Sequence, residues 1–413
     1  MAMSTTIIHG DCLEELKKLE DNSVDAVVCD PPYGLSNTKP QQVADVLKAW
    51  VTGDTVSVPA KRGGFMGKDW DSFVPPPAVW EECMRVLKPG GHMAVFAGAR
   101  TQDLMGLSIR LAGFEIRDTL GWVYGSGFPK SQNISLQIEK QAGKRGHTAK
   151  GFVTAGDYGG RGLVSPDTKV KHPPLTMDEA RQWDGWGTAL KPAIEPILLC
   201  RKPLDGTVAN NVLAHGVGGL NIDACRVPAP YGRPLIVKTG ETSPGSSFDT
   251  AHSRHDPAGT TQGRFPANVL LDEHAAKEMD KQSGVLKSGG GNKAPQKSSW
   301  FTSNSPSVVD NRKPNEGGAS RFFPVFKYQA KAPKKERPVI EREDGSKIQH
   351  PTVKPVALME WLVELITPPG GVVLDPFAGS GTTLQAALNK GFTPIGIEQD
   401  ADYIKLIEQR LSA

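Results

Sequence analysis

The sequence predicts an α/β fold built on a doubly wound, parallel sheet. Short apolar runs typical of buried strands alternate with segments of helical periodicity from Thr5 to Tyr124 and again from Gly371 to Leu411. The second of these segments is the clearest unit, in the order strand, loop, helix, strand, helix. Because parallel strands end at a common edge, a ligand site is expected in the loops that follow them.

Composition sets the limits on the class of protein. The 413 residues are 38% hydrophobic and 23% charged, which is ordinary for a globular protein of two or three domains. A net charge of +3 suits nucleic acid without requiring it. The five scattered cysteines show no C-x-x-C spacing, so neither a disulfide framework nor a metal site is expected. No membrane span or signal peptide is evident, and a cytoplasmic protein is predicted.

A rigid loop follows the first buried strand. The apolar run from Ala26 to Cys29 leads into Asp30-Pro31-Pro32-Tyr33. The two prolines fix φ and remove two N–H donors, so the bend displays a carboxylate, free carbonyls and an aromatic face. Such a loop is suited to hold a flat ring that carries an exocyclic amine. A plain strand-terminating turn is the alternative.

The N-terminal half contains further predicted elements. The polar stretch 34–77 adjoins the loop at Asp30 and is interpreted as a partly mobile lid. The pattern next predicts helices over Trp80–Leu87 and Thr101–Ala112, each followed by a strand, over His92–Phe96 and Glu115–Tyr124. A polar insertion at about 125–190 comes next, and a further strand is predicted over Ile194–Lys202. Pro196 indicates an edge strand or a strand's beginning.

The periodicity collapses between 203 and 345, which marks a domain boundary. Aromatic residues such as Trp300 and Phe326 make this region too apolar for a pure linker. Basic residues gather near its end, at Lys334, Lys335 and Arg337, and Lys130 lies in the earlier insertion. These cations are read either as a solvated face or as contacts to DNA phosphates.

A glycine-rich loop follows the strand that ends at Asp375. Gly379 and Gly381 let the backbone approach a ligand closely, and Glu398 ends the next strand, where it can accept hydrogen bonds from a ribose diol. No lysine stands where a phosphate loop would require one, and the glycine spacing does not match a dinucleotide fold.

Three segments carry a resemblance to a known family. Asp30-Pro31-Pro32-Tyr33 resembles motif IV of the DNA amino-methyltransferases, the run from Asp375 to Thr383 resembles motif I, and His350-Pro351-Thr352-Val353-Lys354-Pro355 resembles motif X. Asp30 precedes Asp375 by 345 positions, and this order resembles the β group, of the phage or restriction-modification type.

The resemblance implies a class I S-adenosylmethionine-dependent methyltransferase fold, Rossmann-like and circularly permuted, with an inserted target-recognition domain. Residues 1–202 would form the N-terminal part of the catalytic domain, 203–345 the target-recognition region and 346–413 the cofactor-binding part.

The implied reaction is methyl transfer from S-adenosyl-L-methionine to N6 of a flipped adenine in double-stranded DNA. Asp30 and the Pro31 carbonyl would accept hydrogen bonds from the amine, beside Pro32, and Tyr33 would stack on the ring. The expected cofactor residues are Asp11, Cys12, His350, Thr352, Lys354, Asp375, Pro376, Phe377, Ala378, Gly379, Ser380, Gly381, Thr382, Thr383 and Glu398. Asp11 is equally well placed to be a helix N-cap. A homodimer and a cognate restriction endonuclease are left open as partners.

Other functions are weighed against this one. An N4-cytosine DNA methyltransferase would more often carry serine in place of Asp30. An RNA or protein methyltransferase would carry Asn-Pro-Pro-Tyr after its glycine loop. A cofactor-binding regulator of DNA could lose Asp30, and a pure DNA-binding module would need no glycine loop. The intact Asp30 and the loop after Asp375 favour the DNA methyltransferase.

Overall fold

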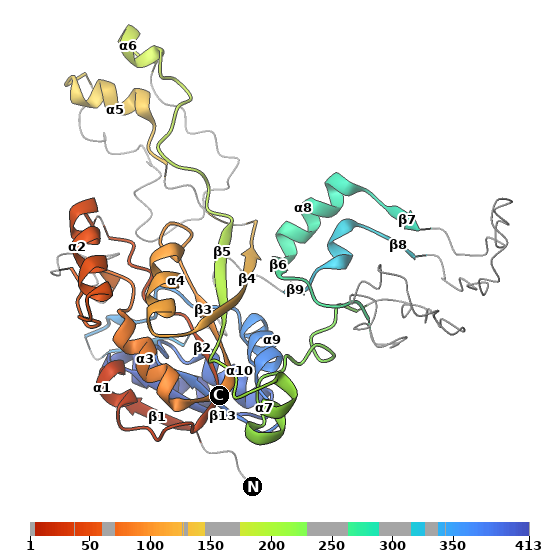
Figure 1. The fold of residues 1–413 in the computed structure, drawn as a ribbon. Helices are drawn as coiled ribbons and strands as arrows, with labels where there is room; N and C mark the ends of the chain where they lie inside the picture. The colour runs from red at the N-terminus through yellow and green to blue at the C-terminus, as the bar shows by residue number, and fades with distance from the viewer. Residues whose placement is uncertain are drawn as a thin grey trace, which may run out of the picture. The chain divides into compact units, whose positions relative to one another are not determined.

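The chain divides into two compact units. The computed structural model describes residues 5–36, 38–59, 71–125, 127, 131–144, 174–228, 263–288, 315–326, 338–342 and 344–412 (Figure 1). One unit consists of Met1–Gly125 with Ile194–Ala413, and the other of Ser126–Ala193. The second unit spans nearly the same residues as the polar insertion expected at about 125–190.

A large sheet forms the main unit. Within the described ranges nine strands pair in the order β1-β13-β12-β2-β3-β5-β4-β6-β9. Their bounds are β1 Thr6–His9, β2 Val24–Cys29, β3 Leu87–Phe96, β4 Glu115–Val123, β5 Ile194–Arg201, β6 Val269–Asp272, β9 Val325–Phe326, β12 Val372–Asp375 and β13 Thr393–Glu398. The predicted α/β fold is confirmed.

Strand β5 departs from the prediction. It runs antiparallel to both of its neighbours, β3 and β4, so the predicted parallel sheet is mostly but not entirely parallel. The segment between β4 and β5 forms the second unit, and an antiparallel return does not need a crossover helix. The strand also lies inside the sheet, so Pro196 marks the strand's beginning and not an edge.

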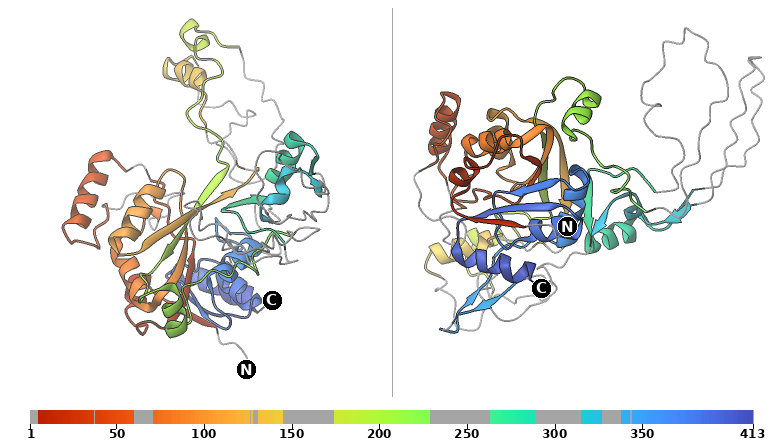
Figure 2. Two further views of the ribbon diagram at one scale, coloured as in Figure 1. Left: turned by 45° about the vertical axis from the view of Figure 1, so that its right-hand side comes forward. Right: turned by 90° about the horizontal axis from the view of Figure 1, so that it is seen from below.

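Helices cover both faces of the sheet (Figure 2). Val27 and Cys29 of β2 pack into a core with α1, α3 and α4, whereas Ala26 and Val28 pack with α9 and α10. This alternation is the period of two expected of a strand buried on both faces. The bounds are α1 Cys12–Leu16, α3 Pro77–Val86, α4 Gln102–Leu111, α9 Val356–Ile366, α10 Thr382–Asn389 and α11 Ala401–Leu411. None of the helices in the described ranges is long and apolar enough to cross a membrane.

Helix α2, Pro40–Val51, lies within the stretch interpreted as a lid and was not predicted. Pro40 begins the helix, where its missing N–H costs no hydrogen bond. Val46 and Trp50 are buried, and Trp50 Nε1 donates to the Ser57 carbonyl at 2.7 Å. Val43 and Leu47 pack against the same core, so the helix is anchored by one apolar face within a polar stretch. The lid function stays a prediction.

Parts of the region 203–345 extend the main sheet. Strand β6 pairs with β4, and β9 pairs with β6. The other described elements there are α7 Val208–His215, α8 Glu273–Ser283, the 3₁₀ helix Ala319–Phe322 and three short strands, β7 Leu286–Ser288, β8 Asn315–Gly317 and β10 Ile340–Glu341; β10 pairs with β11 Lys347–Ile348. Target recognition by this region stays a prediction.

The second unit contains two short helices, α5 Ile134–Gln141 and α6 Asp178–Arg181. Asn133 caps α5 by accepting a hydrogen bond from the Leu136 backbone N–H. The buried carboxylate of Glu139 accepts from Thr176 Oγ1 at 3.0 Å and from the Met177 backbone N–H at 3.3 Å. These contacts connect α5 to the start of α6.

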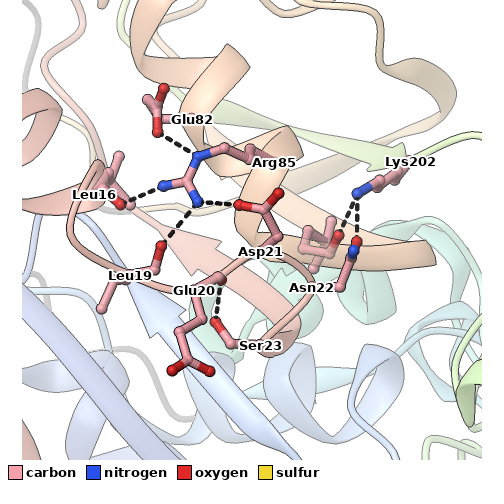
Figure 3. A network of polar contacts seen from close by, with 10 residues as sticks. Leu16, Leu19, Glu20, Asp21, Asn22, Ser23, Glu82, Arg85 and Lys202 are labelled. Atoms are coloured by element: carbon pink, nitrogen blue, oxygen red, sulfur yellow. Dashed lines mark hydrogen bonds and ion pairs between the residues drawn. The ribbon is translucent and has the colours of Figure 1, made fainter.

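Arg85 on α3 connects this helix to the end of α1 (Figure 3). Its guanidinium donates to the carbonyls of Leu16 and Leu19 at 2.7 and 2.8 Å, and to the carboxylates of Asp21 and Glu82 at 2.5 and 2.8 Å. Leu16 is the last residue of α1 and Leu19 lies in the turn that follows, so the fork of guanidinium donors holds the carboxyl end of the helix and its turn. Arg85 therefore holds the first strand–helix unit against α3.

We expect Arg85→Ala to lower the free energy of unfolding by about 2 kcal/mol, because the carbonyls of Leu16 and Leu19 and two carboxylates lose this donor. The control is Lys17→Ala, which breaks an exposed ion pair with Glu14 and should change stability by less than about 0.5 kcal/mol. Urea denaturation of both variants measures the difference. Equal values would contradict the role given to Arg85.

Candidate active site

Four neighbouring strands end at one edge of the sheet. Strands β1, β13, β12 and β2 are adjacent and parallel. Their carboxyl ends carry Asp11, Glu398, Asp375 and Asp30 respectively. Asp30 and Asp375 are far apart in the sequence, but direct pairing of β2 with β12 makes their loops neighbours. The expectation that both loops lie at the same edge is confirmed.

The Asp30 carboxylate has a partner on each oxygen. Lys354 Nζ donates to Oδ2 at 2.6 Å, and the Tyr33 hydroxyl donates to Oδ1 at 2.8 Å. Glu195, at the start of β5, brings a second carboxylate: its Oε2 lies 3.4 Å from Lys354 Nζ and 3.3 Å from the Tyr33 hydroxyl. The side chains of Lys354, Asp30 and Glu195 are 12%, 21% and 27% exposed. We call Asp30, Tyr33, Glu195 and Lys354 the Asp30 cluster.

The two carboxylates decide the protonation of the other two groups. Burial lowers the pKa of Lys354, but the charges and hydrogen bonds of Asp30 and Glu195 outweigh burial and raise that pKa to about 12. Burial, and then the same two carboxylates, raise the pKa of Tyr33 well above its ordinary value. At neutral pH Lys354 is therefore a cation and Tyr33 a neutral hydrogen-bond donor. The ammonium also lies 4.8 Å from the ring centroid of Phe96.

Two further side chains hold the backbone of the loop. Asp71 Oδ1 accepts from the backbone N–H groups of Tyr33 and Gly34 at 2.8 and 3.0 Å. Thr101 Oγ1 donates to the Tyr33 carbonyl at 2.6 Å. The prolines restrict the first half of the loop, and these contacts fix the second half. Asp71 and Thr101 thus fix the backbone of Tyr33, and through it the position of the aromatic ring.

Sequence reasoning missed Glu195, Asp71 and Thr101. Asp71 lies in the polar stretch interpreted as a lid, and Thr101 was assigned only to the start of a helix. Neither the residue types of Asp71 and Thr101 nor their spacing in the sequence distinguishes them from other polar residues. For Glu195 a signal existed, because a carboxylate interrupts the apolar run of β5 next to Pro196.

The loop between β12 and α10 is closely packed. Gly379 and Gly381 have φ values of +53° and +77°, a region that side chains other than glycine rarely adopt. A Cβ atom on Gly379 would lie 3.0 Å from His350 Nε2. Between the glycines, Ser380 is held by Arg410, whose Nε donates to the Ser380 carbonyl at 2.6 Å. Glycine is therefore favoured by conformation at both positions, and a Cβ atom at either would be tightly packed.

Two carboxylates flank this loop, that of the buried Asp375 and that of the partly buried Glu398. Asp375 accepts from the Phe377 backbone N–H at 3.0 Å, and burial raises its pKa to about 7. Glu398 accepts from the backbone N–H groups of Gly379 and Asp400, both at 2.8 Å, and burial raises its pKa as well. A nearby cation or hydroxyl donor would stabilise the ionised form of both carboxylates.

Asp11 caps helix α1, as one of its two predicted roles required. Its Oδ1 accepts from the backbone N–H groups of Leu13 and Glu14 at 3.0 and 3.4 Å. Burial raises the pKa of the neighbouring Cys12 thiol to about 12, so the thiol stays protonated. A cofactor contact of either residue stays a prediction.

The segment from His350 to Lys354 connects the two loops. The His350 ring packs against Tyr403 with 4.7 Å between centroids, its Nδ1 donates to the Thr352 carbonyl, and burial lowers its pKa. Four residues later, Lys354 reaches Asp30. The structure thus brings Lys354, predicted among the cofactor residues, to the carboxylate of the catalytic loop.

The remaining predicted residues divide into two groups. Pro376, Ala378, Thr382 and Thr383 lie in the glycine loop or in the first turn of α10. Lys130, Lys334, Lys335 and Arg337 lie outside the described residues. No group of three or more His, Cys, Asp or Glu side chains in the described part of the chain is placed to hold a metal ion.

Comparison with known proteins agrees with this geometry. A family model described as DNA methylase (N6/N4) matches residues 24–409. The chain belongs to this DNA methylase family. The methylase is 48% identical to DNA adenine methyltransferase YhdJ of Escherichia coli K12 over 98% of the chain and 82% of that protein. It is 24% identical to Type II methyltransferase M.HindIII of Haemophilus influenzae, over 99% of the chain and 96% of the relative.

Two solved structures also resemble the methylase. The M1.HpyAVI complex with S-adenosylmethionine aligns at 15% identity and a TM-score of 0.39, covering 99% of this chain and all of that one. The cytosine-N4-specific PvuII DNA methyltransferase aligns at 13% identity and a TM-score of 0.43, covering 98% and 87%.

S-adenosylmethionine is the methyl donor of the methylase. The glycine loop fits this group. At position 379 a Cβ atom would crowd His350, so the backbone there is left bare for close approach. The buried Asp375 and the partly buried Glu398 lack a cationic partner among the contacts described above. An ammonium and a pair of hydroxyls are the groups that such carboxylates accept.

We expect Gly379→Ala to weaken S-adenosylmethionine binding about ten-fold or more, because the new methyl group meets His350 at 3.0 Å and strains a positive φ. Gly391→Ala is the matched control, since φ is +81° there and the space around it is open. Titration calorimetry compares the two variants. An equal loss in both would show that backbone strain alone is responsible.

The raised pKa of Asp375 predicts a pH effect on stability. Between about pH 4, the unfolded value, and about pH 7 the folded protein holds a proton that the unfolded chain has lost, so this group lowers the free energy of unfolding as pH rises. Asp375→Asn should therefore gain stability relative to wild type between about pH 5 and about pH 8.

Urea denaturation of the cofactor-free wild type and Asp375→Asn, at about pH 5 and about pH 8, measures the difference in their free energies of unfolding. The control is Asp402→Asn, because a hydrogen bond from Arg342 lowers the pKa of Asp402 below this range. Its difference from wild type should not change with pH. A constant difference for Asp375→Asn would show that the carboxylate is already ionised at the lower pH.

Proposed function

We propose that this methylase is a site-specific DNA adenine methyltransferase, which transfers a methyl group from S-adenosylmethionine to the exocyclic N6 of adenine. The observation that carries the proposal is the Asp30 carboxylate, held at the end of β2 next to the glycine loop of β12. Aspartate at this position favours adenine over cytosine. The relative YhdJ, named a DNA adenine methyltransferase, supports the same choice.

The target amine needs two acceptors. Its lone pair is delocalised into the ring, so it is a poor nucleophile. Asp30 and the Pro31 carbonyl would accept its two hydrogens and keep the lone pair free for attack. Each carboxylate oxygen has two lone pairs, so Asp30 can accept the amine while Lys354 stays bound to Oδ2.

Lys354 and Tyr33 would complete the catalytic loop. Lys354 keeps the acceptor oriented and compensates its charge. The target base must leave the duplex to reach this loop, and the Tyr33 ring, fixed through Asp71 and Thr101, would stack on it. The chain's contribution is then mainly positioning.

The cofactor supplies an electrophilic methyl group when bound. Asp375 would hold its ammonium and Glu398 its ribose hydroxyls, while the backbone of Gly379 to Gly381 lines the loop. Asp11 and Cys12, at the neighbouring end of β1, are proposed for the adenine moiety of the cofactor.

The test is to identify the product. The protein is incubated with unmethylated double-stranded DNA and S-adenosylmethionine, and the DNA is digested to nucleosides for mass spectrometry. We expect N6-methyladenine. N4-methylcytosine would overturn the choice of base and keep the methyltransferase. Methylation of RNA or protein alone would overturn DNA as the substrate.

Asp30→Ala should reduce product formation by about a hundred-fold or more, because the amine loses its acceptor. It should leave S-adenosylmethionine binding, measured by calorimetry, largely unchanged, since the Gly379 loop is untouched. Glu408→Ala, an exposed carboxylate on α11, serves as the control. An active Asp30→Ala enzyme would exclude Asp30 as the amine acceptor.

A further inference from the structure

One hydroxyl in the Asp30 cluster faces two acceptors. The Tyr33 oxygen lies 2.8 Å from Asp30 Oδ1 and 3.3 Å from Glu195 Oε2. A phenol carries a single O–H, so it can make one strong hydrogen bond at a time. In this structure the shorter distance assigns that bond to Asp30.

This bond competes with the reaction. If the target amine binds the Asp30 oxygen that Lys354 does not hold, it shares Oδ1 with the Tyr33 hydroxyl. Two donors on one oxygen weaken each other's hydrogen bond, so the amine is held best when the hydroxyl leaves Oδ1. Burial and the two carboxylates raise the pKa of Tyr33, so its hydroxyl keeps its proton and must donate it somewhere. A buried donor without an acceptor would cost free energy.

We propose that Glu195 is a positioning residue: it takes over the hydrogen bond of the Tyr33 hydroxyl when the target amine engages Asp30 Oδ1. The inference rests on the proposed function and deepens it. The exchange requires rotation of one O–H bond, because Glu195 Oε2 is already within 3.3 Å. The ring of Tyr33, which would stack on the base, need not move.

Glu195 is well held for this task. It stands opposite the buried Trp122 in the pairing of β5 with β4, and the carbonyl of the next residue, Pro196, accepts from the Ala97 backbone N–H at 2.9 Å. Lys354 Nζ lies 3.4 Å from its carboxylate and compensates the charge. The second acceptor is therefore fixed and stabilised before any substrate enters.

Glu195 could instead act only through the charge of Lys354, and a double-mutant cycle separates the two roles. The variants are Glu195→Ala, Glu195→Gln, Tyr33→Phe and the combination of Tyr33→Phe with Glu195→Ala. Single-turnover methyl transfer to DNA is measured for each, with calorimetric S-adenosylmethionine binding as the check on folding.

We expect Glu195→Ala to slow methyl transfer about ten-fold or more, since the Tyr33 hydroxyl then stays on Asp30. Glu195→Gln should recover most of the rate, because an amide oxygen also accepts the hydroxyl. In the Tyr33→Phe background, Glu195→Ala should cost less than about two-fold, since no hydroxyl remains to transfer. If Glu195→Ala does not fold, Glu195→Met, of similar length and without an oxygen, replaces it in the cycle.

An equal loss from Glu195→Ala in both backgrounds, or a Glu195→Gln variant as slow as Glu195→Ala, would overturn the proposal and leave charge compensation of Lys354 as the role. A wild-type protein that methylates no DNA would overturn the proposed function itself. The two failures are therefore distinguishable.

Discussion

The ion pair between Lys354 and Asp30 joins two parts of the chain that are 324 positions apart. It lies where the direct pairing of β2 with β12 makes the Asp30 loop and the glycine loop neighbours. The same two strands are linked at their other ends by Asp25, which accepts from the Val372 backbone N–H at 2.7 Å and from Lys88 at 2.6 Å. Strand pairing thus assembles the catalytic loop and the glycine loop, whatever their order in the sequence.

Burial of charge organises the site around this pair. Taking ions out of water is costly unless partners replace the lost hydration. In the Asp30 cluster one ammonium serves two carboxylates, and the Tyr33 hydroxyl supplies the remaining donor. At the glycine loop no cation is present among the described contacts of Asp375, and its pKa rises. The Asp30 cluster is therefore electrostatically satisfied in itself, whereas Asp375 beside the glycine loop has no cation among its described contacts.

The fold shows how a permuted order of segments leads to one site. Strands β12 and β13 come last in the chain, yet they lie between β1 and β2 in the sheet. Strand β5, which returns antiparallel beside β3, brings its first residues to the edge where β2 ends. Glu195 reaches Tyr33 for this reason, and a parallel β5 would have placed it at the opposite edge.

Local patterns in the sequence determined much of the protein. Apolar runs bounded by turn residues predicted β2, β12 and β13, and the Asp30 and Gly379 loops followed from proline and glycine chemistry within a few residues. Only the tertiary structure decided the direction of β5, the partner of Lys354, and the places of Glu195, Asp71 and Thr101. The physical reason is that a loop's conformation depends on its own residues, whereas a side chain's partner depends on which strands pair and in which direction.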